Sequence, residues 1–202
     1  SLKENNPTNK GAKSVLLPSP YAIKMALLNQ IITIDGLEKL SDISKTKSSK
    51  FFNFIRDANI DYHLSNENSF VVNNSFIKIL DPKRSEQGIG FKQTVVFREF
   101  VFIRGNLEFI FTVKNEEQAN FLKKYIHKIN YFGKRGSFFQ FIEYRNDSNE
   151  ANIMTFDGKT GNAGMLQSYD NFDDKVTFEQ VNNYSTASTK RKQEIKIIPV
   201  SL

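Results

Sequence analysis

Apolar residues recur every three or four positions in three stretches of the chain, and this spacing predicts three helices. The three stretches are residues 20–33, 48–58 and 116–129. The first has clear end signals, because Ser19 can cap it, Pro20 suits the first helical position, and Gly36 can stop it. We expect this strongly apolar helix to pack on a sheet.

Residues typical of β-strands fill the centre of the chain. The predicted strands are residues 69–80, 91–104 and 107–113. Gly105-Asn106 is a turn signal, so we expect the last two of these strands to pair as a hairpin. Residues 59–69 are expected to form a loop rich in Asn and Ser, and residues 81–90 a basic loop that begins with Asp-Pro.

The pattern is less regular in the last third of the chain. Residues 130–144 contain a Gly-Lys-Arg-Gly loop and then a predicted strand. Residues 145–174 are rich in Asn, Asp, Ser and Gly and have little periodicity, and short strands are predicted after them at residues 176–178 and 194–200. We therefore divide the chain into two regions, the second smaller and more variable. These regions are residues 1–144 and 145–202.

The order of these elements is helix, strands, helix and strand. It predicts an α+β fold with helices on one face of an antiparallel sheet. A ferredoxin-like domain would need a further strand before the first helix. That strand could lie only in the polar first 14 residues or ahead of the sequence given.

Composition narrows the classes of function. The chain has 202 residues, no cysteine and two histidines, which excludes disulfide frameworks, thiol nucleophiles and cysteine-bound metal centres. We expect neither a metal nor another cofactor. No apolar run of the ~18 residues needed to cross a bilayer is present, so we expect a cytoplasmic protein without a membrane partner. A formal net charge of +6 is compatible with an anionic partner.

The sequence Gly-Lys-Arg-Gly at residues 133–136 is the first candidate for contact with an anion. Its two glycines let backbone N–H groups approach a phosphate, and its two cations supply charge. The aromatic neighbours could stack on unpaired bases. The candidate residues are Tyr131, Gly133, Lys134, Arg135, Gly136 and Phe138. The competing interpretation is a helix-to-strand turn with solvated charges and core phenylalanines.

A second basic segment surrounds the predicted loop at residues 81–90. Its candidates are Lys83, Arg84, Lys92, Gln93 and Arg98. On an extended strand Lys92 and Arg98 share one face, so the loop and strand together could follow a nucleic-acid backbone. The alternative is an exposed hairpin with ordinary charges, in which Arg98 and Glu99 form an ion pair.

Acid–base chemistry has few candidates in this chain. Metal-independent ribonucleases move protons with His, Tyr or Lys side chains, and Tyr125, His127 and Lys128 are the residues that could do so here. Helical phase places Tyr125 on the apolar stripe and turns His127 away from it, which favours a surface histidine. We therefore assign no catalytic residue and keep these three as the alternative.

Five segments carry a resemblance in their order and spacing, and it covers most of residues 15–200. They are LLPSPYAIKMALL (16–28), FIKILDPKR (76–84), FKQTVVFREFVFIRGNLEFIF (91–111), INYFGKRGSFFQF (129–141), and LQSYDNF with VTFEQVN (within 166–182). Together they resemble the CRISPR-associated RAMP subunit numbered five. That subunit caps the 5′ end of the guide RNA in type I Cascade complexes.

The resemblance implies an RRM-like (ferredoxin-like) RAMP domain, with a protruding β-hairpin called the thumb at residues 81–96. It also implies a non-catalytic subunit that binds the 5′ handle of the guide CRISPR RNA (crRNA). The protein partners would be the Cascade backbone subunit and the large subunit, close to the target DNA beside the PAM. One branch of the family cleaves precursor crRNA, so a metal-independent endoribonuclease is the alternative function.

Overall fold

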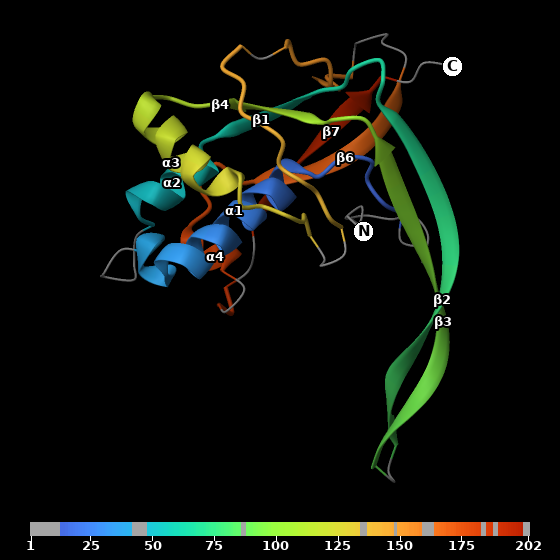
Figure 1. Cartoon of the computed structure of the whole chain (residues 1–202). Helices are drawn as coiled ribbons and strands as arrows, with labels where there is room; N and C mark the ends of the chain where they lie inside the picture. Colours follow the sequence, from blue (N-terminus) through green and yellow to red (C-terminus); the bar gives the residue numbers. More distant parts are fainter. Residues whose placement is uncertain are drawn as a thin grey trace.

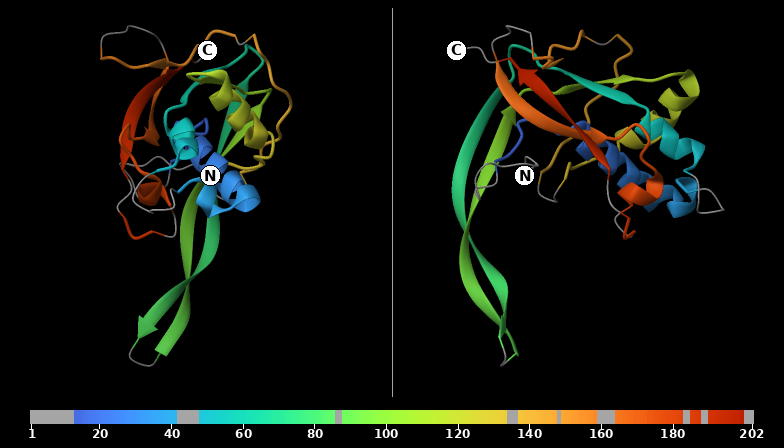
Figure 2. Two further views of the ribbon diagram at one scale, coloured as in Figure 1. Left: turned by 90° about the vertical axis from the view of Figure 1, so that its left-hand side faces the viewer. Right: turned by 180° about the vertical axis from the view of Figure 1, so that it is seen from behind.

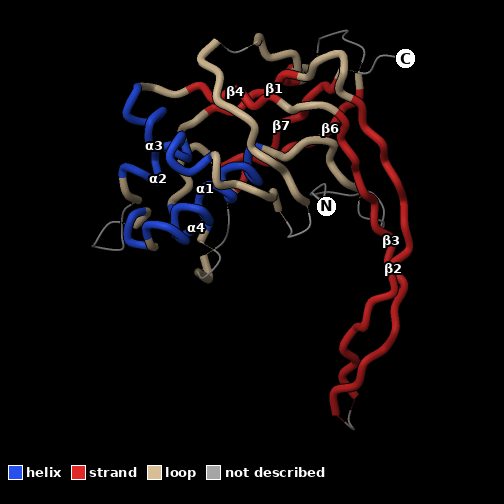
Figure 3. The backbone as a smooth tube through the Cα atoms, in the orientation of Figure 1, coloured by secondary structure: helices blue, strands red, loops and turns tan. Residues whose placement is uncertain are grey.

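The computed structural model contains a mixed α+β body from which one long, two-stranded ribbon projects (Figure 1). It describes residues 13–41, 48–85, 88–133, 137–147, 149–158, 164–182, 185–187 and 190–199. The helices gather on the side of the body away from the ribbon (Figure 3). The expected fold class, α+β with antiparallel sheets, is confirmed. No helix within the described ranges is long and apolar enough to cross a membrane.

The three helices predicted from apolar spacing are present. α1 (Pro20–Asp35) begins after Ser19, whose Oγ accepts the N–H of Ala22 at 3.2 Å, and it stops at Gly36, which has a φ of 85°. The other helical elements are η1 (Leu37–Lys39), α2 (Lys50–Arg56), α3 (Glu116–Ile126) and α4 (Phe178–Val181). Side-chain caps also begin α2 and α3, so local signals explain where the long helices start.

Short strands form two small sheets in the body. β1 (Asn59–His63) pairs antiparallel with β4 (Glu108–Thr112). In the other sheet, β7 (Arg191–Ile198) lies between β5 (Met154–Thr155) and β6 (Met165–Phe172), again with antiparallel pairing. The predicted packing of the first helix on a sheet is confirmed, because α1 lies against β6.

β2 (Ser69–Ser85) and β3 (Gly88–Arg104) form the projecting ribbon, which twists as it leaves the body (Figure 2). The hairpin predicted between residues 91–104 and 107–113 is wrong, because β3 pairs with β2 and β4 pairs with β1. Gly105 does reverse the chain, with a φ of 84°. That turn leads β4 back to β1 in the body instead of along β3.

The Asp-Pro pair at residues 81–82 does not end its strand. Pro82 lies opposite Phe91 inside the ribbon. Both strands of a two-stranded ribbon are edge strands, so each tolerates a residue that lacks an N–H donor. The hairpin therefore extends over residues 69–104, well beyond the residues 81–96 expected for the thumb.

Two segments expected to lack strands contain them. Residues 59–63 form β1 because Ile60 and Tyr62 alternate with polar residues and are buried. Two apolar positions are too short a pattern to mark a strand by themselves. Residues 145–174, which have little periodicity, contain β5 and part of the β6–β7 ladder.

Two segments expected to form strands do not. The chain at Phe178–Val181 is the short helix α4, and the Gln180 side chain accepts the N–H of Thr177 at 3.1 Å at its start. In residues 137–144, no strand of two or more residues is present. Of their phenylalanines, Phe139 packs against the buried Phe132, whereas Phe138 is exposed.

One core unites the helices with both sheets of the body. Its fully buried side chains include Leu27 and Ile31 of α1, Phe52 of α2, Tyr62 of β1 and Phe172 of β6. The rings of Phe52 and Phe172 stack with centroids 6.2 Å apart. Side chains from both predicted regions, before and after residue 145, therefore contribute to the same core.

Candidate nucleic-acid interface

The glycine-rich loop follows α3 and is closed at its base by main-chain contacts. Tyr131 and Phe138 form an isolated antiparallel bridge across the loop. Next to this bridge, the N–H of Phe139 donates to the carbonyl of Asn130 at 3.0 Å. These contacts hold the two legs of the loop together at its base.

Gly133 begins the turn of this loop with a φ of 71°, a left-handed conformation that L side chains rarely adopt. Glycine is therefore required here by the backbone, whatever the loop binds. Three of the predicted anion-binding residues, Lys134, Arg135 and Gly136, lie outside the described residues. Their predicted role in binding phosphate stays a prediction.

The aromatic residues that flank the loop divide into two groups. Phe132 is only 5% exposed, and its ring packs edge-on against Phe139 and Phe109, with centroids 4.8 and 5.8 Å away. Phe138 is 79% exposed. Phe132 therefore anchors the loop to the core, as the competing interpretation expected, whereas Phe138 is free to stack on a partner.

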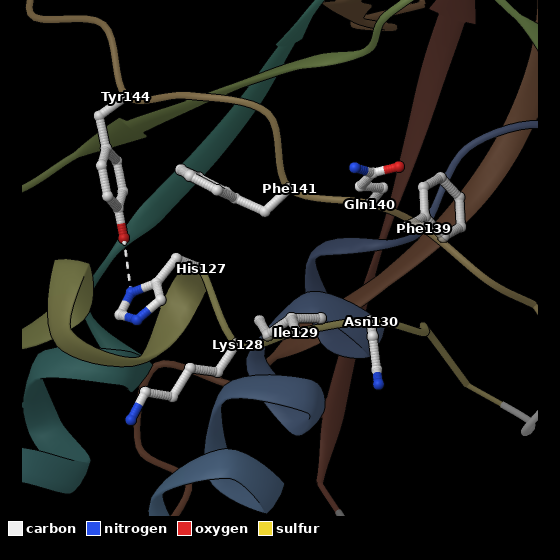
Figure 4. Close-up of a pocket in the computed structure, with 8 residues that line it drawn as sticks. All are labelled: His127, Lys128, Ile129, Asn130, Phe139, Gln140, Phe141 and Tyr144. Atoms are coloured by element: carbon white, nitrogen blue, oxygen red, sulfur yellow. Dashed lines mark hydrogen bonds between the residues drawn. The ribbon is translucent and has the colours of Figure 1, made fainter.

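A pocket of about 500 Å³ lies at the base of the loop, where residues 127–130 pass beside residues 139–144 (Figure 4). Its lining residues are His127, Lys128, Ile129, Asn130, Phe139, Gln140, Phe141 and Tyr144. We call it the loop-base pocket. It combines aromatic rings, side-chain amides and one lysine, which is the mixture that proteins use to hold unpaired bases beside their phosphates.

His127 and Tyr144 share one backbone acceptor in this pocket. The carbonyl of Lys123 lies 3.0 Å from His127 Nδ1 and accepts the Tyr144 hydroxyl at 2.5 Å. Because a carbonyl can only accept, Nδ1 carries a proton, and Nε2 has no hydrogen-bond partner among the described residues. Burial raises the pKa of Tyr144, so its hydroxyl stays protonated at neutral pH. Figure 4 shows Tyr144 pointing toward His127, with Phe141 beside them.

Tyr125 points to the opposite side of α3, into the core, as its helical phase predicted. Its hydroxyl donates to the Asp35 carboxylate, and burial raises its pKa. The three residues kept as an alternative catalytic set are therefore separated. His127 and Lys128 line the loop-base pocket, and Tyr144 is the tyrosine beside them. Tyr144 was missed because no local pattern links it to α3.

Lys83, Arg84 and Lys92 belong to the outer part of the ribbon, whereas Arg98 lies opposite Ser75, nearer the body. Lys92 and Arg98 share one face of β3 and Gln93 lies on the other, as strand alternation predicted. For Lys83 and Arg84 the structure describes the backbone alone, which places them near the end of β2. Lys92 and Arg98 thus place positive charge at two points along one face of β3.

Arg98 and Glu99 do not form the ion pair that the alternative interpretation of this segment expected. Neighbouring residues of a strand face opposite sides, and Glu99 Oε2 accepts the N–H of Ser14 at 2.5 Å. The Ser14 hydroxyl also donates to the Glu99 carbonyl at 2.9 Å. These contacts tie the segment before α1 to the root of the ribbon and help to fix its direction.

Large apolar side chains, with Lys78 and Gln93 among them, line one ribbon face from its middle toward its tip. They are Phe76, Leu80, Phe91, Val95 and Phe97, and we call them the apolar stripe. Phe91 is 71% exposed, and Phe76 is 66% exposed although its ring lies 4.2 Å from that of Phe97. Contiguous apolar exposure on this scale marks a surface that another molecule covers. The sequence predicted that residues 91–104 pair with residues 107–113, so this face of the β2–β3 ribbon was not anticipated.

Comparison with known proteins finds no match: no protein-family model, no curated protein and no solved structure matches this chain. Within the part of the chain that the structure describes, no group of three or more His, Cys, Asp or Glu residues could hold a metal ion. Function is therefore inferred from the residues of this chain.

Proposed function

We propose that this chain is a non-catalytic subunit of a type I CRISPR Cascade complex that binds the 5′ handle of the crRNA. The observation that carries the proposal is the ribbon, which projects from an α+β body and exposes the apolar stripe. Such a surface lowers the solubility of an isolated monomer, whereas an assembled subunit buries it against a partner. The ribbon suits the role of the thumb that the resemblance implies.

The proposal includes an RRM-like core. Along the chain α1, β1, β4 and α3 come in the order helix, strand, strand, helix, with η1 and α2 between α1 and β1, and β1 pairs antiparallel with β4. This order supports the proposal because a ferredoxin-like fold has the same four elements at its centre, with one strand before them and one after. The ribbon is inserted between the two paired strands, as an extension of the hairpin that would join them.

The crRNA handle would lie along the glycine-rich loop and the loop-base pocket. Phe138 would stack on one base, and the rings of Phe141 and His127 would hold another in the pocket. Lys134 and Arg135 would contact phosphates. The apolar stripe would face the Cascade backbone subunit. The protein would also contact the large subunit, close to the PAM of the target DNA.

A mobility-shift assay with labelled repeat RNA in EDTA tests this proposal. We expect the wild-type protein to shift the handle without cutting it, more tightly than a scrambled handle. Arg135→Ala should weaken binding and reduce the salt slope by about one. Lys50→Ala is the matched control, because Lys50 is an exposed lysine of α2 that pairs with Glu117. Equal affinity for both RNAs would contradict handle recognition.

A second candidate function, a metal-independent endoribonuclease, is favoured by one observation. His127, Lys128 and Tyr144 all line the loop-base pocket, and the Tyr144 hydroxyl points toward the His127 ring. If the wild-type protein cuts repeat RNA in EDTA, and His127→Ala slows cleavage by ~10²–10⁴, this function replaces the first.

A further inference from the structure

A second cavity, of about 380 Å³, lies in the body away from the loop-base pocket. It is bounded by α1, the end of α2, the start of β1, the end of β6 and the start of β7. Its charged lining residues are Lys24, Arg56, Asp57, Lys114, Asp174 and Lys192. We call it the Lys24 cavity. None of these residues belongs to the candidate nucleic-acid interface.

Lys24 is the unusual member of this set, because it is only 2% exposed. Its ammonium donates to the carbonyl of Arg56 at 2.8 Å and lies 5.6 Å from the ring centroid of Phe172. An ammonium has three donors, and among the described residues one of them has a hydrogen-bond acceptor. Lys24 is thus a buried cation on the wall of a cavity, and it has unpaired hydrogen-bond donors among the described residues. Such a group can bind an acceptor that enters the cavity from outside.

The other cations of the cavity already have carboxylate partners. Asp57 pairs with Arg56 at 2.7 Å and with Lys114 at 2.8 Å. Lys192 pairs with Asp174 at 2.9 Å and approaches Glu194 at 3.6 Å. The lining therefore holds four cations and two carboxylates, Asp57 and Asp174. Lys24 forms no ion pair with a described residue, so the excess positive charge is centred on it.

The pKa of Lys24 agrees with an unmet need for negative charge. Burial, and then the nearby charge of Lys192, lower it to about 8, although Glu194, Asp57 and Asp174 act in the opposite direction. The carboxylates present do not offset the cost of the buried ammonium. An anion that enters the cavity would stabilise the charged form and raise this pKa.

We propose that the Lys24 cavity binds a phosphate group, either inorganic phosphate or the phosphate of a small phosphomonoester. A tetrahedral phosphate offers several acceptor oxygens, which suits the free donors of Lys24 and the guanidinium of Arg56. Arg56 commits its Nε to Asp57 and keeps its terminal nitrogens for a second acceptor. The site does not rest on the proposed RNA binding, since it uses different residues.

Nuclear magnetic resonance of the Lys24 side chain, titrated with inorganic phosphate, tests the site in the intact protein. We expect a saturable shift and a rise of about one unit in the pKa of Lys24. Lys24→Met should abolish the saturable shift of its cavity neighbours, whereas Lys50→Met, an exposed lysine of α2, should leave binding unchanged. No saturable shift up to about 10 mM phosphate would overturn the proposal.

A second variant and a second ligand complete the test. If Lys24→Met does not fold, Arg56→Gln removes the second proposed phosphate ligand and should weaken phosphate binding several-fold, and unchanged binding would contradict the site. A nucleoside 5′-monophosphate, titrated in parallel, separates the two sources of the phosphate. Tighter binding than inorganic phosphate assigns the cavity to a phosphomonoester, and equal or weaker binding assigns it to phosphate itself.

Discussion

Phe132 and Phe138 flank the same loop, yet truncation to alanine should lower the stability of the fold only at Phe132. Phe132 is 5% exposed and packs edge-on against two rings, so Phe132→Ala should cost about 3–5 kcal/mol of unfolding free energy. Phe138 is 79% exposed, so Phe138→Ala should stay within about 0.5 kcal/mol of the wild type. Urea denaturation followed by circular dichroism measures both values.

Affinity for the crRNA handle, measured on the folded proteins, should fall more for Phe138→Ala than for Phe132→Ala. Stacking of one base on an aromatic ring contributes about 1–3 kcal/mol, so Phe138→Ala should weaken affinity roughly 5- to 150-fold. Fluorescence anisotropy with the labelled handle measures this loss. The reasoning is refuted if Phe138→Ala unfolds more easily by over ~1 kcal/mol, or if it binds the handle as well as the wild type.

Three other substitutions test the fold and the ribbon. Tyr62→Phe removes a buried hydroxyl that donates to a backbone carbonyl at 2.7 Å, so urea denaturation should show a loss of ~1–3 kcal/mol. Hydrogen bonds from Lys124 and then Tyr125 lower the pKa of Asp35, so its carboxylate stabilises the fold at neutral pH and this contribution is lost as the pH falls below about 4. Asp35→Asn should therefore lower Tm at pH 7 and flatten the fall of Tm in acid. Phe91→Ser should leave stability within about 0.5 kcal/mol and weaken co-elution with the Cascade backbone subunit in size-exclusion chromatography.

Local signals predicted the helices well, because each one acts within a few residues. Ser19 caps α1 and Gly36 ends it through contacts inside one turn. Strand pairing is different, since a turn signal such as Gly105 reverses the chain without choosing the partner. The energetic choice between β2 and β4 as neighbours of β3 depends on long-range packing, which a short pattern does not contain.

The candidate sites were predictable only in part. The glycine-rich loop and the phase of His127 follow from the sequence, because both are local features. Tyr144 reaches the loop-base pocket through an irregular segment whose path is set by tertiary contacts. Lys24 sits within an apolar helix, and only the packing of β6 and the end of α2 around it reveals a buried ammonium.

The 5′ ends of RNA that co-purifies with the protein test the central claim most directly. Sequencing of these ends after expression beside a type I CRISPR array gives the result in one measurement. If the chain caps the crRNA handle, the bound RNA should share one defined 5′ end derived from the repeat, and Phe138→Ala should reduce its yield. Bound RNA with scattered 5′ ends, or none above the level of a control protein of similar charge, would contradict the proposed function.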